Sequence, residues 1–230
     1  MGRSKSAPAA PTRMQTPGRR ESEFIGRVTA SATHEIRNVL AIVKESAGLI
    51  SDLVHASGAG GSTPHADRLL KAAGRIDAQV TRGADIVTHL TRFAHSMDEE
   101  VRRVDLDEEV HQVAFLSQRL ARTKSQTVQA ARRAEPVWLT GNPIHVQMAL
   151  YSTVAFCLDY LPVGCSLELR AEHENGVPEA HFRCNAGGAA ADPAARPEWA
   201  RLEAQVSDLG VGVRPESEGL GVRLLYEGGG

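Results

Sequence analysis

Two long runs of apolar residues repeat at intervals of three and four positions, and they limit what this chain can fold into. The first run is Ile36, Leu40, Val43, Ala47, Ile50 and Val54. The second run is Leu69, Ala73, Ile76, Val80, Gly83, Val87, Leu90, Ala94 and Met97. This spacing places each run along one face of a helix. A segment rich in Gly, Ser and Pro separates the runs at 55–64, so the sequence predicts a hairpin of two long helices.

The first helix also carries a second apolar stripe, formed by Val28, Ala32, Val39, Ile42, Leu49 and Leu53. We assign the first run to the inside of the hairpin, which leaves this second stripe uncovered. A single partner helix cannot cover both stripes, whereas two hairpins together can form a four-helix bundle. The sequence therefore predicts a homodimer through residues 24–97. The alternative is that the C-terminal region covers the second stripe within one chain.

After a charged segment at 98–106, which we interpret as a linker, the pattern changes. Helices are expected at 108–122 and 143–161, and short strands at 128–131 and 137–139. Alternating residues at 166–173 and 177–184 flank Glu174-Asn175-Gly176, a strong hairpin turn. The expected fold class is α+β. A dimerising helical hairpin at 24–98 precedes a small α/β-sandwich domain at 104–230.

Composition excludes several classes of protein. Residues 1–23 are basic and rich in Pro, Ser and Ala, which predicts a disordered tail. Lys and Arg total 26 against 28 Asp and Glu, so there is no electrostatic case for nucleic acid as the main partner. No apolar run reaches the roughly 18 residues of a membrane span. The three cysteines form no CxxC pair. We therefore expect no disulfide framework, no metal site and a cytoplasmic location.

One polar cluster carries the candidate chemistry: Thr33-His34-Glu35-Ile36-Arg37-Asn38. His34 and Asn38 are one helical turn apart and lie on a polar face. One nitrogen of a neutral imidazole can attack while the N–H of the other is held. Glu35 could move a proton, Arg37 could attract a phosphoryl group and Asn38 could orient a water or a phosphoryl oxygen. The alternative is that His34 is an exposed, solvated side chain without chemistry.

The segment Phe24…His34-Glu35-Ile36-Arg37-Asn38-Val39-Leu40 resembles the H-box of bacterial sensor histidine kinases. Residues 82–94 resemble the second helix of the same dimerisation domain. The resemblance implies that His34 is phosphorylated and exchanges its phosphoryl group with an aspartate on a response-regulator receiver domain. It assigns proton transfer to Glu35 and phosphatase activity to Asn38. This sequence departs from the family at Val39, where the family usually has proline.

The same resemblance implies that residues 104–230 descend from an ATP-binding domain, although its nucleotide site is degenerate. Ser152 and Phe156 stand where two asparagines are expected, and Phe156 has no oxygen for Mg²⁺. By the spacing of the hairpin, Asn185 and Gly187 fall where the family's D-x-G-x-G segment contacts adenine. A second register places that segment at Asp208-Leu209-Gly210-Val211-Gly212. The last glycine box would contain Gly219 and Gly221, so the candidate cofactor-binding residues are Asn185, Gly187, Gly219 and Gly221.

These observations lead to three hypotheses. The first is a dimeric phosphotransferase or phosphatase that acts on a receiver domain through His34, Glu35, Arg37 and Asn38 and requires no cofactor. The second is an active sensor histidine kinase with a divergent pocket, which would need ATP and Mg²⁺. The third is a non-enzymatic dimeric scaffold that binds a response regulator.

Overall fold

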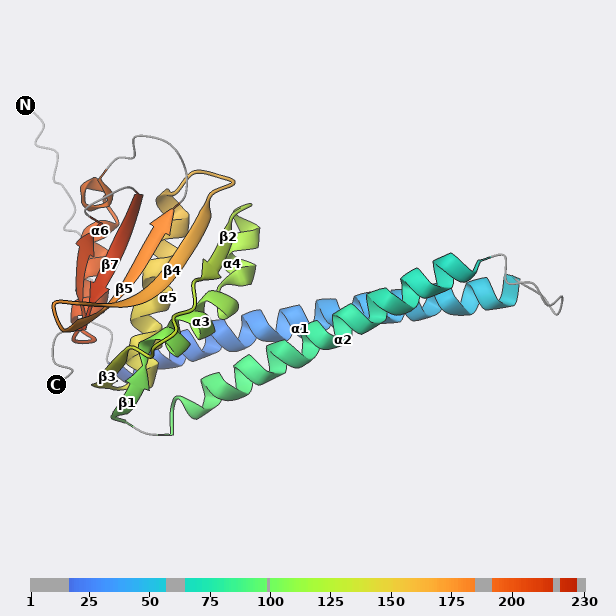
Figure 1. Cartoon of the computed structure of the whole chain (residues 1–230), viewed down its shortest axis with the longest axis horizontal. Coiled ribbons are helices and arrows are strands. Elements are labelled where there is room, and N and C mark those ends of the chain that lie inside the picture. Colours follow the sequence, from blue (N-terminus) through green and yellow to red (C-terminus); the bar gives the residue numbers. More distant parts are fainter. Residues whose placement is uncertain (1–16, 57–64, 99, 185–191, 217–219, 227–230) are drawn as a thin grey trace, which may run out of the picture.

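A computed structural model describes residues 17–56, 65–98, 100–184, 192–216 and 220–226 of the chain. Two long antiparallel helices, α1 (Pro17–Ala56) and α2 (Ala66–His95), project from a smaller α/β domain (Figure 1). The predicted helical hairpin and α+β fold class are confirmed. The prediction of a disordered tail is wrong for residues 17–23, which form the first turns of α1. None of the described helices is long and apolar enough to span a membrane.

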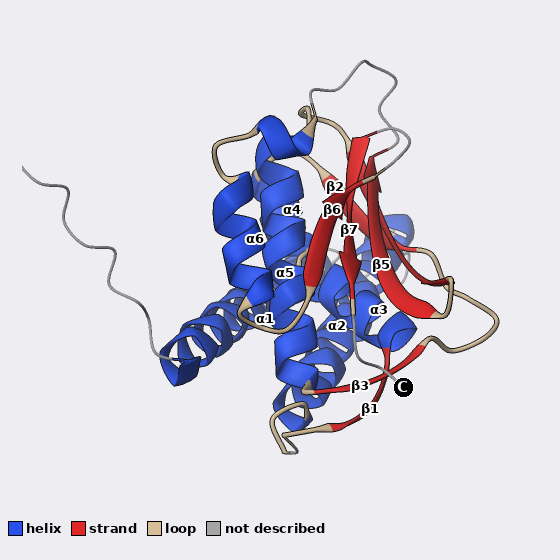
Figure 2. Cartoon of the chain, turned by 90° about the vertical axis from the view of Figure 1, so that its left-hand side faces the viewer, coloured by secondary structure: helices blue, strands red, loops and turns tan. Residues whose placement is uncertain are grey.

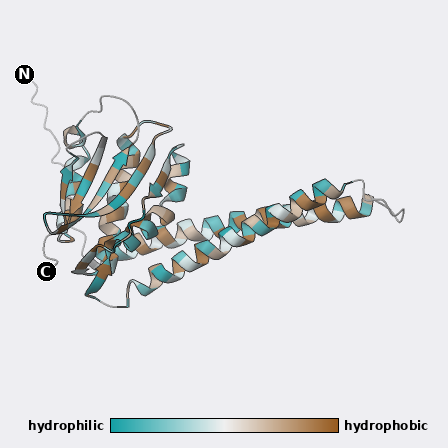
Figure 3. Ribbon diagram, in the orientation of Figure 1, coloured by the Kyte–Doolittle hydropathy of each residue, from teal (hydrophilic) through white to brown (hydrophobic). Residues whose placement is uncertain are grey.

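The two helices meet through a different stripe from the one that the sequence analysis places inside the hairpin. Val39 is buried against α2 and Leu53 is also buried, whereas Leu40 and Val54 of the first run are 61% and 57% exposed. On α2 the buried residues are Ala72, Ile86 and Phe93, and none of them belongs to the predicted run. Figure 3 shows why hydropathy cannot choose between the stripes, since hydrophobic residues occur on more than one side of both helices.

A local packing detail explains the choice of stripe. A Cβ atom placed on Gly83 of α2 would lie 3.2 Å from Cγ1 of Val39, so the valine sits directly over the glycine. This contact lets the two helices approach closely at mid-length. It also gives a structural role to Val39, the position at which this chain departs from the proline of the H-box. Helix α1 is assigned as one continuous element through this residue.

The second domain is built on a five-stranded mixed sheet in the order β2-β4-β5-β7-β6. Its strands are β2 (Thr127–Ala130), β4 (Ser166–Glu174), β5 (Val177–Cys184), β6 (Gly212–Pro215) and β7 (Leu220–Leu225). The β2–β4 pair is parallel and the other pairs are antiparallel. A separate pair joins β1 (Arg102–Asp105) to β3 (Trp138–Gly141), so the segment predicted as a linker contains a strand.

Helices cover one face of this sheet and leave the other face free of helices (Figure 2). They are α3 (Leu106–Leu116), α4 (Gln118–Thr123), α5 (Pro143–Tyr160) and α6 (Trp199–Ser207), with a short 3₁₀ turn, η1 (Pro193–Ala195). Asp105 and Asn142 cap the N-termini of α3 and α5 through side-chain oxygens, which accept backbone N–H groups. The core lies between these helices and the inward residues of the strands.

The β4–β5 hairpin forms as predicted. Asn175 and Gly176 have φ angles of 53° and 81°, the left-handed pair that a two-residue hairpin turn requires. The cysteine prediction is wrong, because Cys165 and Cys184 form a disulfide with their Cα atoms 6.4 Å apart. Cys165 immediately precedes β4, and Cys184 ends β5 opposite Leu167 in the sheet register. The sheet therefore brings together two cysteines whose separation in sequence matches no motif.

The second domain packs on the half of the hairpin that contains the start of α1 and the end of α2. Phe24 and Phe93 form a buried cluster with Ile144 and Met148 of α5. The rings of His89 on α2 and Phe115 on α3 stack with centroids 3.8 Å apart. These contacts fix the domain against the hairpin close to the candidate histidine, which lies about three helical turns after Phe24.

Candidate functional site

His34 lies on the exposed surface of α1, as the polar pattern predicts. Its Nδ1 atom is 3.2 Å from Nδ2 of Asn38, one turn further along the helix. Because the contact uses Nδ1, the imidazole Nε2 atom is the nitrogen left for a reaction partner. The structure therefore brings together two of the four candidate catalytic residues, His34 and Asn38.

The carboxamide of Asn38 can determine which tautomer His34 adopts. A rotation of the amide by 180° presents Oδ1 to the ring in place of Nδ2, and this oxygen would accept the Nδ1–H proton. A neutral imidazole that donates through Nδ1 has its lone pair on Nε2. This arrangement provides an exposed nucleophile whose other nitrogen is held.

Glu35 points away from the His34 ring and into the boundary between the hairpin and the second domain. Its Oε2 atom accepts a hydrogen bond from Arg82 of α2, and Nη2 of Arg122 on α4 lies 2.5 Å from the same oxygen. The glutamate side chain is only 13% exposed. The sequence analysis missed Arg122, which is 87 residues away from Glu35 and belongs to no recognisable motif.

A pocket of about 80 Å³ lies against this ion-pair cluster between α1, α2 and the α3–α4 segment. Its wall combines apolar groups, including Ile86 and Phe115, with the charged groups of Glu35, Arg82 and Arg122. The pocket is thus next to the phosphoacceptor candidate but on a different side of α1. No described contact joins the carboxylate of Glu35 to the His34 ring.

The surface around His34 is open and is formed largely by small residues. A shallow groove along α1 includes Gly26, Ala30, Thr33, His34 and Arg37. Arg37 is exposed beside the histidine and contributes positive charge to this surface. Small side chains leave room for a second protein to approach the imidazole.

Ser152 and Phe156 of α5 stand where the resembled ATP site has two asparagines. Phe156 is buried, and its ring packs against Tyr160 and Trp199 with centroid distances of 5.1 and 5.8 Å. Ser152 and Asp159 line a polar groove of about 240 Å³ between α5 and α6. Asp159 also forms an ion pair with Lys124.

The glycine candidates are only partly described. Asn185, Gly187 and Gly219 lie outside the described residues. Gly221 lies within β7, where a Cβ atom would be 2.3 Å from the carbonyl oxygen of Phe182. Close packing of the sheet is therefore a sufficient reason for a glycine at this position. Asp208, the first residue of the alternative D-x-G-x-G segment, forms an ion pair with Arg20 of α1 at 2.5 Å.

Several solved structures share similarity with this chain. The cytoplasmic segment of histidine kinase QseC has a TM-score of 0.42 and 15% identity, over 64% of this chain and 93% of that chain. Histidine kinase AdeS of Acinetobacter baumannii has a TM-score of 0.42 and 13% identity, over 84% and 95%. A bacterial phosphotransferase has a TM-score of 0.45 and 14% identity, over 92% and 97%. No family model and no curated protein sequence matches the chain. Its structural neighbours are thus histidine kinases and a phosphotransferase.

Proposed function

We propose that this protein exchanges a phosphoryl group between His34 and an aspartate of a response-regulator receiver domain. The observation that supports this most directly is the exposed imidazole on α1, with Nδ1 next to the amide of Asn38 and Nε2 open to a partner. A long helix holds this nucleophile in one orientation, which lowers the entropic cost of reaching the attack geometry. Two-component signalling is the wider process to which such a step belongs.

The step requires no chemistry beyond that of an imidazole and an aspartyl phosphate. The Nε2 lone pair attacks phosphorus, the P–O bond to the aspartyl carboxylate breaks and a P–N bond forms. The Nδ1–H proton, held by the oxygen of the Asn38 amide, then leaves to solvent. Attack by the carboxylate reverses the step, and attack by water releases phosphate. Arg37 would balance part of the negative charge on the phosphoryl oxygens.

This function requires no nucleotide bound to the chain, because the receiver domain supplies the aspartate and its Mg²⁺. The burial of Phe156 in an aromatic cluster supports this interpretation, since a metal-holding amide at that position is missing. ATP and Mg²⁺ enter only under the alternative of an active histidine kinase. The proposal places the exchange in the cytoplasm.

The proposal includes a homodimer formed through the hairpin. Leu40 and Val54 on α1, and Val80 and Val87 on α2, are each more than half exposed. At about 100° per residue, the exposed stripe of α1 lies roughly 90° from the face that contacts α2. A second hairpin would cover these residues and complete a four-helix bundle, while His34 stays outside it.

A chemical phosphoryl donor tests the central step without knowledge of the partner. The protein would be incubated with potassium phosphoramidate and analysed for an acid-labile phosphohistidine. We expect label at His34 in the wild type and its loss in H34Q. H95Q, which removes another exposed histidine of the hairpin, would keep the label. Equal labelling of H34Q and wild type would contradict the proposal.

The remaining alternatives are separated by two further measurements. Incubation with γ-labelled ATP and Mg²⁺ would label His34 if the chain is an active kinase and leave it unlabelled if it is not. A panel of phosphorylated receiver domains would lose phosphate to the wild type but not to H34Q. A receiver that binds both proteins equally and loses no phosphate to either would support the scaffold instead.

A further inference from the structure

The open face of the sheet contains a cluster of metal-ligating side chains outside the phosphotransfer site. Glu174 is at the end of β4, and Glu179 and His181 are on β5. One carboxylate oxygen from each glutamate and one ring nitrogen of the histidine lie within 4.8 Å of one another. Glu174 is exposed, whereas Glu179 and His181 are buried.

The buried histidine points an unpaired nitrogen into this cluster. His181 is only 4% exposed, and its Nε2 atom has no hydrogen-bond partner among the described residues. Oε2 of Glu179 lies 3.6 Å from this nitrogen and also lacks a hydrogen bond among the described residues. Burying two polar atoms without a hydrogen bond is costly, and the charged neighbours at 3.5–3.6 Å offset this cost only in part. A cation bound by both atoms would remove the cost.

The other nitrogen of the same ring is fixed by a carboxylate. Nδ1 of His181 is 2.6 Å from Oε1 of Glu216, which follows β6. Glu216 can reach the ring because Gly221 has no side chain, and a Cβ atom at Gly221 would lie 2.8 Å from Cγ of Glu216. A carboxylate on one nitrogen of an imidazole is the usual support for a metal on the other nitrogen, since it holds the ring with the Nε2 lone pair free.

From this geometry we propose that Glu174, Glu179 and His181 bind a divalent transition-metal ion, with Zn²⁺ as the best match. Zinc takes imidazole nitrogen and carboxylate oxygen at about 2.0–2.2 Å, so two tetrahedral ligands lie about 3.4 Å apart. The observed 3.6 Å between Nε2 of His181 and Oε2 of Glu179 is close to that separation. Glu174 supplies the third ligand from the solvent side, and water completes the coordination.

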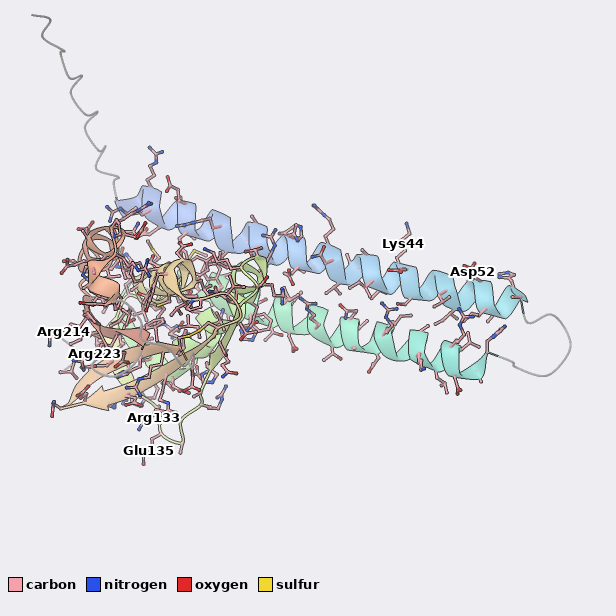
Figure 4. The ribbon with its side chains drawn as sticks, turned by 90° about the horizontal axis from the view of Figure 1, so that it is seen from above. Lys44, Asp52, Arg133, Glu135, Arg214 and Arg223 are labelled. Atoms are coloured by element: carbon pink, nitrogen blue, oxygen red, sulfur yellow. A yellow bond between two sulfur atoms is a disulfide. The ribbon has the colours of Figure 1, made fainter. Side chains whose placement is uncertain are left out.

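Arg223 of β7 is the competitor for these carboxylates. Its Nη1 atom lies 2.9 Å from Oε2 of Glu174 and 3.5 Å from Oε2 of Glu179. Its Nε atom is buried without a hydrogen bond among the described residues. Figure 4 shows Arg223 near Arg214 at the end of the molecule away from the hairpin tip. A metal would displace the guanidinium group from the glutamates. Arg223 therefore lowers the affinity of the site for the metal and is not one of its ligands.

Zinc titration of the metal-free chain by isothermal calorimetry, with EDTA-treated protein, tests the assignment. We expect a single site whose affinity falls at least tenfold in E174Q and rises in R223Q. E203Q is the control, because Glu203 is exposed on α6, which covers the other face of the sheet, and should bind as the wild type does. E216Q should weaken binding about 10–100-fold through the orientation of His181.

Substituting cobalt for zinc adds a readout that a surface histidine would not give. Bound at His181 in a four-coordinate site, Co²⁺ should show intense visible absorption, and this should be lost in H181Q while the far-ultraviolet circular dichroism is retained. If H181Q does not fold, E174Q decides the question, since its side chain is exposed. Absence of zinc binding, or binding that E174Q and E203Q weaken equally, would overturn the proposal. Neither result depends on the reactivity of His34.

Discussion

Arg122 of α4 and Glu35 of α1 meet across the boundary between the second domain and the hairpin, with Nη2 of the arginine 2.5 Å from Oε2 of the glutamate. Glu35 is the residue after His34, so the second domain holds the carboxylate adjacent to the phosphoacceptor candidate. Through this contact the second domain can influence the histidine without binding a nucleotide. The reactivity of His34 can therefore depend on where the second domain sits on the hairpin.

We predict that R122A increases the rate at which phosphoramidate labels His34. The substitution removes one of the two positive charges paired with Glu35, so the net negative charge near His34 grows. That charge favours the positive charge that the imidazole takes on as it attacks phosphorus. An exposed ion pair contributes about 0.2–1 kcal/mol, so the increase should be up to about fivefold. The labelling rate would be followed on gels that separate the phosphorylated protein.

The control for this experiment is K124A. It removes the ion pair between Lys124 and Asp159, which is close in sequence to Arg122 but does not involve Glu35. A labelling rate unchanged in R122A, or raised equally in both variants, would show that the contact with Arg122 does not restrain the reaction.

The sequence is sufficient to predict the hairpin, because the three- and four-residue spacing of apolar residues indicates a helix regardless of the partner against which that helix packs. It does not decide which stripe faces α2, since Leu40 and Val39 are equally apolar and only the packing of Val39 over Gly83 distinguishes them. The β4–β5 hairpin was predictable for a local reason, namely that Asn175-Gly176 favours the left-handed turn.

Contacts between distant segments are where the sequence analysis fails. The Cys165–Cys184 disulfide depends on the register of two strands, and the pairing of Glu35 with Arg122 depends on how one domain sits on another. His34 and Asn38 were found because a helix fixes the relation of residues four apart. Glu35 was assigned a role beside His34 from adjacency in sequence, but adjacent residues on a helix point about 100° apart.

Close packing at Gly83 predicts different effects on stability for two Gly-to-Ala substitutions. G48A is at an open position on α1, with no atom within 4 Å of the new Cβ, and should raise the free energy of unfolding by about 0.5–1 kcal/mol. In G83A the new methyl group meets Val39 at 3.2 Å, which should offset that gain. G83L should destabilise the protein by about 1–3 kcal/mol. Urea unfolding of the three variants would measure the differences, and a gain in G83A equal to that in G48A would disprove the close contact.

The exposed apolar stripe predicts that charge at Leu40 or Val87 prevents dimerisation. L40E and V87E place a carboxylate where a second hairpin would pack, and each should shift the protein from dimer to monomer in light scattering after size exclusion. D52K is the control, because Asp52 lies on the side of α1 away from α2 (Figure 4). Helix content should be retained in all three. A wild-type protein that is already a monomer at micromolar concentration would refute this prediction.

The buried carboxyl group of Glu109 on α3 should make the stability of the protein depend on pH. Burial raises the pKa of its carboxyl group above the ordinary value of 4.5, partly offset by a hydrogen bond from Gln147 and by the charges of Arg92 and Arg102. A raised pKa in the folded state means that the protonated form is favoured there. Its contribution to stability is therefore fully present below about pH 4.5 and is lost as the pH rises through the folded-state pKa.

E109Q separates this effect from other titrations, because glutamine stays neutral and can still accept the hydrogen bond from Nε2 of Gln147, which is 2.7 Å long in the wild type. We expect the free energy of unfolding of E109Q to exceed that of the wild type by an amount that grows with pH above 4.5, at no more than about 1.4 kcal/mol per pH unit. E108Q, at an exposed position of the same helix, should show no such growth. Urea unfolding between pH 4 and 8 would follow the difference, and a constant difference would mean that Glu109 titrates alike in the folded and unfolded chain.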